Sequence, residues 1–358
     1  MISGSNNPKP CKVLVVSDGK KGPSATQRIS FGEPFAHDPL ERYRIIFAGE
    51  RPEGTEIAAA FEAIAPQLLV LSRSTSSAGA EWIKAAGEAR VPVVFHIDDD
   101  LLSVPPSLGE AKFNSYNDPV RLAALRANIE ASDLLYVSTS ALADRFAEHG
   151  IQTPTVAGEI YCSVSGDDIG ALVAPATGPV IGYMGTSGHA ADLDTILPAI
   201  CDVMEKVPSL QFELFGTIRM PSVLEGFGRR VRHLSPVADY REFVAKLRSL
   251  GWWIGLAPLE DNSFNRCKAD TKWVEYSQAG IAVIASDLPV YERACADGAG
   301  ILAHTPEQWS RSCLELLYRP QLRVVTVQKA QERLRQLYSH DLLRAQVDRI
   351  FERVLQPA

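Results

Sequence analysis

Short apolar segments alternate with segments of helical periodicity along the whole chain, and this alternation constrains the fold more than any other feature. Strands of a parallel sheet are covered by helices on both faces, so they read as continuous apolar runs. The pattern therefore predicts an α/β protein built on doubly wound parallel sheets. The expected strands are Val13–Ser17, Arg44–Phe47, Leu68–Leu71, Val93–Ile97, Leu134–Ser138, Thr155–Val156, Val180–Met184, Gln211–Phe215, Val231–Leu234, Trp253–Ala257, Ala282–Ala285 and Gly300–Leu302. The expected helices are Glu56–Ile64, Ala80–Ala89, Val120–Ala131, Thr139–His149, Leu193–Lys206, Asp239–Leu250, Lys272–Ala279, Pro306–Tyr318 and Val327–Tyr338.

A chain of 358 residues is long for one core and sufficient for two domains. The stretch Ser163–Pro179 is rich in Gly, Ala, Ser, Thr, Asp and Pro, interrupts the periodic pattern and marks the expected boundary. The predicted units are therefore residues 1–165, 166–338 and a last helix over 339–358. Ser339 can cap that helix, whose apolar residues fall on one face. These residues are Leu342, Leu343, Val347, Ile350, Phe351 and Val354.

Composition excludes several classes of protein. The net charge of −7 argues against broad nucleic-acid binding. The six cysteines stand singly, without the spacing of a zinc site, which fits a reducing cytosol. The N-terminus lacks the apolar region of a secretory signal, and no apolar run approaches the ~20 residues of a membrane helix. A cytoplasmic location is expected. Peripheral contact with the inner face of the membrane, through Arg229, Arg230 and Arg232, and the oligomeric state stay open.

The segment between the expected strands Trp253–Ala257 and Ala282–Ala285 is polar and contains Arg266, Lys268 and Lys272. Ligands of parallel α/β sheets bind outside the carboxyl ends of strands, where this loop is expected. It also leads into a helix N-terminus, whose N–H groups favour anions. The combination predicts a phosphate or diphosphate ligand. The alternative is a solvated basic loop whose cations pair with neighbouring carboxylates of Asp261, Asp270 and Glu275.

The sequence from Glu275 to Ser286, EYSQAGIAVIAS, resembles the donor-binding region of GT-B glycosyltransferases, specifically the retaining GT4-like group. The resemblance implies two Rossmann-like domains facing across a cleft, with acceptor bound by the first and nucleotide-sugar donor by the second. It also implies that the last helix crosses back to the N-terminal domain; the alternative is packing on its own domain. Glu275 would bind the ribose hydroxyls, since a carboxylate accepts two hydrogen bonds from a vicinal diol. Cys267 stands where the family has a second glutamate, so sugar recognition by this position is not implied.

A glycine-rich turn follows the strand at Val180–Met184 and opens the second domain. Glycine lets the backbone approach a phosphate closely, so Gly185, Thr186, Ser187 and His189 are candidate donor ligands. Asn265, Arg266, Lys268, Lys272 and Glu275 complete the predicted donor set. The resembling family commonly has an arginine and a lysine in this turn, where this chain has Tyr183 and His189. Gly216–Ile218 and Ser235–Pro236 would contact the base, by the same resemblance.

The sequence VVFHIDDDLLSV, residues 93–104, is the notable polar motif of the first half. His96, Asp98 and Asp99 are candidates to orient or deprotonate the acceptor hydroxyl. Lys268 and Lys272 are candidates to stabilise charge on the departing diphosphate. Adjacent carboxylates can also bind a divalent cation. GT-B enzymes generally need no bound metal, however, and consecutive strand residues point to opposite sides. The first loop, residues 17–28, offers Lys20, Lys21 and Arg28 to the acceptor or the donor phosphates, or is a solvated turn.

The resemblance therefore implies a retaining, metal-independent glycosyltransferase without a cofactor. Its partners would be a nucleotide-diphosphate sugar and a carbohydrate, lipid-linked or other hydroxyl acceptor, as in cell-surface polysaccharide or glycoconjugate synthesis. Two alternatives remain. One is a catalytically impaired glycosyltransferase-like binding protein, which Tyr183, His189 and Cys267 motivate. The other is a sugar-nucleotide epimerase of the same fold.

Overall fold

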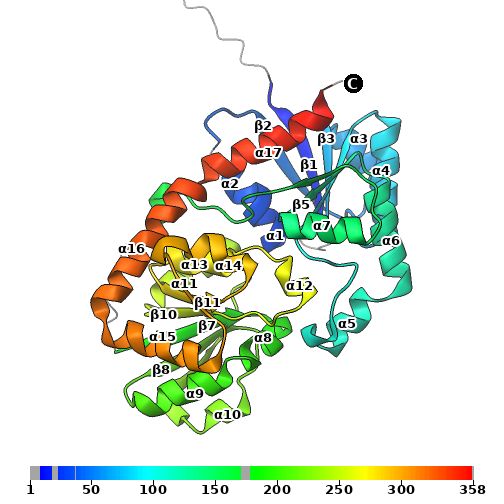
Figure 1. The fold of residues 1–358 in the computed structure, drawn as a ribbon. Coiled ribbons are helices and arrows are strands. Elements are labelled where there is room, and N and C mark those ends of the chain that lie inside the picture. Colours follow the sequence, from blue (N-terminus) through cyan, green and yellow to red (C-terminus); the bar gives the residue numbers. More distant parts are fainter. Residues whose placement is uncertain (1–8, 18–22, 37, 171–177, 357–358) are drawn as a thin grey trace, which may run out of the picture. The chain divides into compact units, whose positions relative to one another are not determined.

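The computed structural model describes residues 9–17, 23–36, 38–170 and 178–356 (Figure 1). The chain divides into two compact units, each assembled from separate stretches of sequence. Unit 1 comprises residues 1–98, 118–159 and 343–358, and unit 2 comprises residues 99–117 and 160–342. The chain therefore changes unit at positions 98, 117, 159 and 342, rather than near 165 and 338 alone.

Unit 1 contains a parallel sheet in the order β2-β1-β3-β4-β5-β6. Most residues of β1, β3, β4 and β5 are fully buried, as expected for strands covered on both faces. The sheet order changes direction between β1 and β3. The strands are β1 Cys11–Ser17, β2 Tyr43–Gly49, β3 Leu68–Ser72, β4 Val93–Ile97, β5 Leu134–Val137 and β6 Thr155–Ala157.

Unit 2 contains a second parallel sheet, in the order β12-β11-β10-β7-β8-β9. This is the Rossmann strand order, and its direction changes between β7 and β10. An apolar core, including Leu193, Phe212, Leu256 and Leu316, packs helices onto the sheet. The strands are β7 Val180–Gly185, β8 Gln211–Gly216, β9 Val231–Leu234, β10 Ile254–Ala257, β11 Ala282–Ser286 and β12 Ile301–Ala303.

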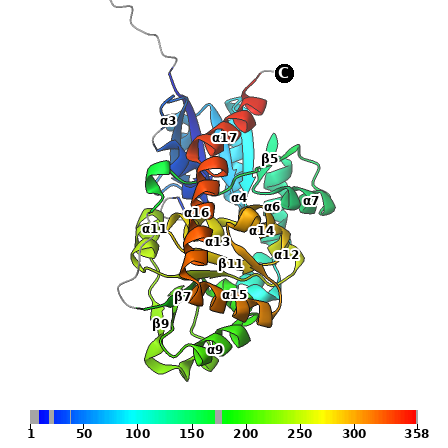
Figure 2. The ribbon, with the colours of Figure 1, turned by 60° about the vertical axis from the view of Figure 1, so that its left-hand side comes forward.

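Helices connect the strands in both units, and within unit 2 α16 packs against α13 and α15 (Figure 2). In unit 1 they are α1 Ala25–Gln27, α2 Glu33–Phe35, α3 Ile57–Ile64, α4 Ser77–Glu88, α6 Pro119–Glu130 and α7 Ser140–Glu148, with a π-turn, η1, at Arg28–Gly32. In unit 2 they are α5 Glu110–Tyr116, α8 Ala190–Asp194, α9 Leu197–Lys206, α10 Ser222–Glu225, α11 Tyr240–Ser249, α12 Ser263–Arg266, α13 Thr271–Gln278, α14 Pro289–Cys295, α15 Pro306–Tyr318 and α16 Pro320–Leu337. Short 3₁₀ turns include η2 at Pro106–Leu108 and η4 at Ser187–His189.

All twelve expected strands are present, and their ends lie within two residues of the expected bounds. The single helix expected over Leu193–Lys206 is wrong: α8 ends at Asp194 and α9 begins at Leu197. Pro198 lies in the first turn of α9, where its missing N–H costs nothing, whereas inside a continuous helix it would remove a hydrogen bond. The helices α1, α2, α5, α10, α12 and α14 were not expected.

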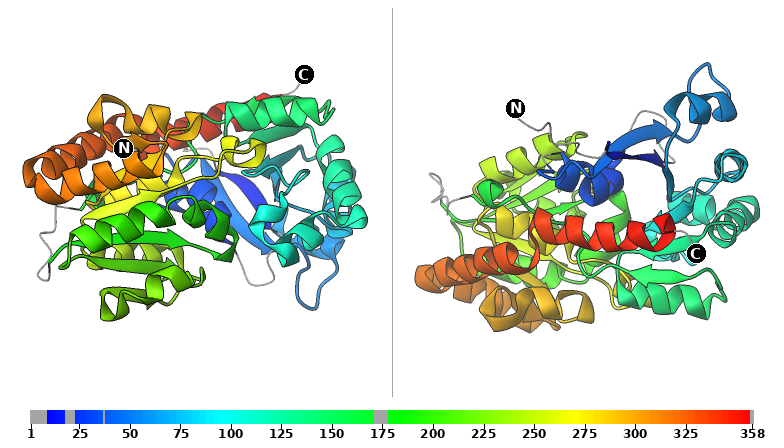
Figure 3. Two further views of the ribbon diagram at one scale, coloured as in Figure 1. Left: turned by 60° about the horizontal axis from the view of Figure 1, so that its bottom comes forward. Right: turned by 90° about the horizontal axis from the view of Figure 1, so that it is seen from above.

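The last helix, α17 His340–Leu355, packs mainly within unit 1 although the preceding α16 belongs to unit 2 (Figure 3). Ser339 Oγ accepts a hydrogen bond from Leu342 N, as the capping prediction requires. The Phe351 ring is fully buried and stacks on Phe31 with centroids 6.2 Å apart. Tyr43 donates a hydrogen bond to Asp348 over 2.6 Å. The helix therefore returns to the N-terminal unit, and the alternative of packing on its own domain is wrong.

One segment departs from the simple two-domain order. Residues Asp99–Asn117 follow β4 of unit 1 but pack within unit 2, and the chain re-enters unit 1 at Asp118. We call this segment the strap. It contains η2 and α5, and η2 packs against η4 and α8. Across the described residues, no helix is long and apolar enough to cross a membrane.

Candidate functional site

A pocket of ≈ 230 Å³ opens within unit 2 beside the point where the strand order changes direction. Open α/β sheets bind ligands at this point, outside the carboxyl ends of the strands. The walls come from the segments that follow β7, β8 and β9 and from α13. The lining residues are Met184, Gly185, Thr186, His189, Phe215, Gly216, Thr217, Pro236, Val237, Phe243, Lys272 and Glu275.

The glycine-rich turn after β7 forms one wall of the pocket. Thr217 Oγ1 accepts a hydrogen bond from Ser187 N over 3.0 Å, which ties this turn to the end of β8. Gly216 has φ +128°, and a Cβ there would lie 2.2 Å from Gly185 O, so only glycine allows the two strand ends to meet this closely. The predicted donor residues Gly185, Thr186 and His189 line the pocket, as does Thr217, which was expected to contact the base.

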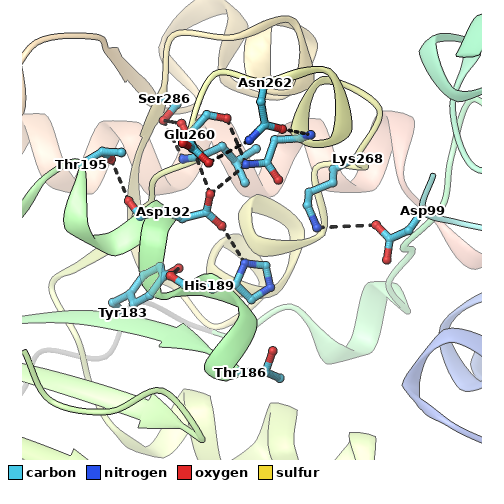
Figure 4. Close-up of polar contacts among 12 residues, drawn as sticks. Asp99, Tyr183, Thr186, His189, Asp192, Thr195, Glu260, Asn262, Lys268 and Ser286 are labelled. Carbon is cyan, nitrogen blue, oxygen red and sulfur yellow. Dashed lines mark hydrogen bonds and ion pairs between the residues drawn. The ribbon is translucent and has the colours of Figure 1, made fainter. Parts of the chain in front are cut away.

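His189 is held by Asp192, with Nδ1 and Oδ2 2.8 Å apart (Figure 4). Nearby Lys272, together with burial, lowers the pKa of His189 to about 4, and the hydrogen bond to Asp192 opposes this shift. The imidazole is therefore neutral at pH 7, with Nδ1–H donating to the carboxylate and Nε2 left as an acceptor. His189 can accept a hydrogen bond from a ligand, but it does not replace the cation that the resembling family has in this turn.

Asn265 supports the site rather than lining the pocket. Its side chain is buried and donates hydrogen bonds to Asp192 Oδ1 and to Glu260 O, over 2.9 and 3.0 Å. Asp192 Oδ1 also accepts from Glu260 N over 2.9 Å. Burial raises the pKa of Asp192, but the hydrogen bonds from His189 and Glu260 outweigh it and leave the carboxyl below its ordinary pKa. This network fixes the α12 loop to the glycine-rich turn.

Lys272 and Glu275 project from α13 into the pocket. Burial, with a smaller contribution from the charge of Lys268, lowers the pKa of Lys272 to about 8, and Asp192 and Glu275 oppose the shift. Burial raises the pKa of Glu275 to about 7, against the charge of Lys272 and a hydrogen bond from Tyr240. Burial disfavours the charged form of both groups. A ligand with an anionic group for Lys272 and hydroxyls for Glu275 would offset this cost. A cation and a carboxylate three positions apart on one helix can thus hold a phosphate and a diol.

Lys268 lies near Lys272 without lining the pocket. Its Nζ is 3.5 Å from Asp99 Oδ1 of the strap and 4.8 Å from the centroid of the Phe264 ring. Figure 4 shows the side chains of Lys268 and Asp99 pointing toward each other. The positive charge of Lys268 lowers the pKa of both Lys272 and His189, so it acts on the pocket from nearby.

Arg266, one of the predicted donor residues, and its neighbour Cys267 do not line the pocket. The half-exposed Arg266 makes a bidentate ion pair with Asp261, over 2.5 and 2.8 Å, which is the alternative considered for this basic loop. Arg266 is the last residue of the short α12 and points to solvent, whereas the preceding Asn265 is buried. Cys267 is buried and its Sγ donates to Ser263 O over 3.2 Å, so it completes local packing.

The acidic motif of the first half is divided between the two units, since Asp98 belongs to unit 1 and Asp99 to unit 2. Asp98 accepts hydrogen bonds from Arg73 over 2.8 Å and from Thr26 over 3.1 Å. His96 is fully buried in unit 1, 3.0 Å from Ser72 Oγ, and burial lowers its pKa to about 4. A buried, neutral imidazole beside Phe31 and Tyr136 fits a structural part of the unit 1 core.

The first loop was expected to offer Lys20 and Lys21, which lie outside the described residues. Its described end places Gln27 inside unit 1, where Nε2 donates to Ser72 Oγ over 2.8 Å.

Within the described part of the chain, no group of three or more His, Cys, Asp or Glu side chains could hold a metal ion. Sequence reasoning missed Phe243, which lines the pocket, and Tyr240, which hydrogen-bonds Glu275, because α11 reads only as an amphipathic helix. It also missed Lys112 of α5.

No protein-family model matches the chain, and no curated protein sequence matches it significantly. Comparison with solved structures does find proteins of the same fold. HepE from Anabaena, solved in complex with UDP, has a TM-score of 0.66 at 15% identity, over 95% of this chain and 99% of that one. Sucrose-phosphate synthase from Thermosynechococcus elongatus has a TM-score of 0.64 at 14% identity, over 96% and 99%. A glycosyltransferase from Rickettsia africae has a TM-score of 0.66 at 12% identity, over 98% and 100%.

The two parallel sheets with their flanking helices and the returning α17 define a two-domain α/β protein of the Rossmann type. The structural matches along nearly the whole chain specify it further: this chain has the GT-B fold. Identities of this size show the fold and leave the activity to be argued from the site.

Proposed function

We propose that this protein is a glycosyltransferase that moves a sugar from a nucleotide-diphosphate sugar to an acceptor hydroxyl. The observation that carries the proposal is the unit 2 pocket, which combines a glycine-rich turn, Lys272 and Glu275 at the switch point of a Rossmann sheet. These groups suit a phosphate and a vicinal diol, the two features that every ribonucleoside diphosphate shares. HepE, a protein of the same fold, was solved with UDP and with UDP-glucose.

In this proposal Glu275 accepts hydrogen bonds from the ribose hydroxyls, and Lys272 faces the diphosphate across the glycine-rich turn. As the bond from the sugar to the diphosphate breaks, negative charge grows on the departing oxygen. A desolvated ammonium group that is already in place stabilises this charge more strongly than water would. Neutral His189, which lines the same pocket, accepts a hydrogen bond from a sugar hydroxyl.

Three finer features belong to the same proposal. Retention of configuration and membership of the GT4-like group rest on the sequence around Glu275. Metal independence is supported by Lys268 and Lys272, which supply the positive charge that a divalent cation supplies in other transferases. The acceptor is a carbohydrate, lipid-linked or other hydroxyl compound bound by unit 1, in cytoplasmic glycoconjugate or surface-polysaccharide synthesis.

A thermal-shift screen with UDP, GDP, ADP and their sugar derivatives tests the donor assignment. A ligand that binds only the folded protein stabilises it by about 2.7 kcal/mol at a hundredfold excess over Kd. We expect one nucleotide diphosphate to raise the melting temperature of the wild type and to leave Glu275→Ala unshifted. Glu205→Ala, an exposed glutamate of unit 2, is the matched control and should respond like the wild type. If no nucleotide stabilises the wild type, the proposal is wrong.

A second candidate function is nucleotide binding without turnover. It is favoured by Cys267, which is buried and hydrogen-bonded to Ser263 O where the resembling enzymes have a glutamate. The two candidates differ in one measurement, because both bind nucleotide but only the transferase consumes donor. Release of nucleoside diphosphate from the sugar donor, faster with acceptor than without, supports the transferase. Binding of donor without any release supports the second candidate.

A further inference from the structure

The glycine-rich turn faces the expected diphosphate with no cation of its own. Tyr183 stands where the resembling family has an arginine, and its ring is fully buried in the unit 2 core. Its hydroxyl donates to His189 O over 3.3 Å, which braces the turn. His189 is neutral at pH 7 for the reasons given above. A further positive charge at this turn would therefore come from elsewhere in the chain.

The strap places Lys112 on this turn. Its Nζ lies 3.5 Å from Thr186 Oγ1, and Thr186 lines the pocket. The side chain runs across Gly188, where an added Cβ would lie 2.4 Å from Nζ and 3.3 Å from Cδ and Cε. Glycine at position 188 thus leaves the space that the lysine occupies. Lys112 comes from α5, remote in sequence from the turn, so the contact depends on how the strap folds.

Contacts at the start and in the middle of the strap attach it to the rest of unit 2. Asp99 at its start lies 3.5 Å from Lys268, and η2 packs against η4 and α8, the elements that follow β7. Asn117 at its end donates to Val104 O over 3.0 Å, which closes the strap on itself. These interactions hold α5 beside the glycine-rich turn.

We propose that Lys112 is a third cationic ligand of the donor diphosphate, delivered to the glycine-rich turn by the strap. This inference rests on the proposed function. Lys272 lines the pocket from α13 with Lys268 nearby, and Lys112 adds a charge at Thr186 of the glycine-rich turn, which lines the same pocket. A lysine suits this role because its ammonium is a compact charge on a flexible stem, able to turn from Thr186 toward a phosphate oxygen.

The test measures how affinity depends on the number of phosphates. The base is the one whose diphosphate stabilises the wild type most among UDP, GDP and ADP. Its nucleoside, monophosphate and diphosphate are titrated calorimetrically into wild type, Lys112→Gln and Gly188→Ala. Lys206→Gln, an exposed lysine of unit 2 paired with Asp202, is the matched control. Gly188 has no positive φ, so alanine there displaces only the flexible tip of Lys112.

We expect Lys112→Gln to weaken the diphosphate about tenfold, the monophosphate less and the nucleoside not at all, as for the loss of one charge-assisted contact. Gly188→Ala should weaken the three ligands in the same order but by smaller factors, and the control should match the wild type. Equal diphosphate affinity in Lys112→Gln and wild type would overturn the inference while leaving the proposed function intact. Equal weakening of all three ligands would also overturn it, since that pattern indicates a structural role. Absence of binding to the wild type would remove both.

Discussion

Lys272 and Glu275 illustrate how one turn of helix prepares two opposite charges for a ligand. Burial lowers the pKa of the lysine to about 8 and raises the pKa of the glutamate to about 7. A diphosphate needs Lys272 protonated, and a diol is bound best by ionised Glu275. We therefore expect affinity for the nucleotide diphosphate to rise as pH passes about 7, to be highest between about 7 and 8, and to fall above about 8.

The variants Lys272→Met and Glu275→Gln separate the two limbs of this profile in calorimetric titrations from pH 6 to about 9.5. Lys272→Met should bind more weakly and lose the alkaline fall, because no ammonium remains to be deprotonated. Glu275→Gln should lose part of the acid limb; the rest comes from the phosphate itself, whose second pKa is about 6. The ionisations of the nucleotide itself are the same for the wild type and both variants. A pH profile unchanged by both substitutions would therefore contradict the assignment of its limbs to Lys272 and Glu275.

His96 gives a prediction about stability rather than catalysis. In the folded protein burial lowers its pKa to about 4 from the ordinary value of 6.5. Between these values the unfolded chain binds a proton that the folded chain does not, so stability falls as pH falls from 6.5 toward 4. The loss amounts to about 3 kcal/mol at most.

Urea denaturation of unit 1 at pH 6.5 and pH 4 measures this term. His96→Gln should be less stable at both values but should lose less stability on acidification. His304→Gln, an exposed histidine, is the control and should keep the wild-type difference. If His96→Gln loses as much stability between pH 6.5 and pH 4 as the wild type, the buried imidazole is not the responsible group.

At the scale of elements, the inner strands could be predicted because burial on both faces leaves mostly apolar residues in them. Val93–Ile97, which is buried throughout, matches its predicted bounds for this reason. Helices were predicted where an apolar face repeats, and missed where it does not. The four residues of α12 are too few to show a period, so the sequence could not tell that Asn265 turns inward and Arg266 outward. Lys112 was missed because the strap carries no signal for the unit against which it packs.

The strap also predicts an effect of its first residue. Asp99 lies 3.5 Å from Lys268 and places a carboxylate beside the cations that would meet a diphosphate. Replacing it by asparagine removes one negative charge and frees Lys268 for the ligand. We expect Asp99→Asn to bind the nucleotide diphosphate about three- to tenfold more tightly by calorimetry, an effect that salt should reduce. Asp167→Asn makes the same change in net charge at an exposed position of unit 2 and should leave the affinity unchanged. Weaker binding by Asp99→Asn would show that the carboxylate supports the site instead.

At the scale of the molecule, the sequence indicated two Rossmann-like units because each half repeats the same alternation. It could not indicate that both units are discontinuous. The strap leaves unit 1 after β4, and α17 re-enters unit 1 after α16; both are decided by packing between residues remote in sequence. The apolar face of α17 was readable, but any exposed sheet or helix surface could have received it. Only the resemblance to GT-B proteins indicated which unit it joins.

The discontinuity makes a prediction about which unit depends on the C-terminus. Phe351 of α17 is fully buried in unit 1 against Phe31 and Tyr43. Phe351→Ala should therefore destabilise unit 1 by about 3–5 kcal/mol, the usual cost of a large cavity. Hydrogen exchange should show faster exchange of the amides of β1 and β2, with the amides of β7 and β8 unchanged. Leu342→Ala, on the same helix but 41% exposed, should change neither set. If Phe351→Ala accelerated exchange equally in both sheets, the two units would unfold as one, and the last helix would stabilise the whole chain rather than the unit it joins.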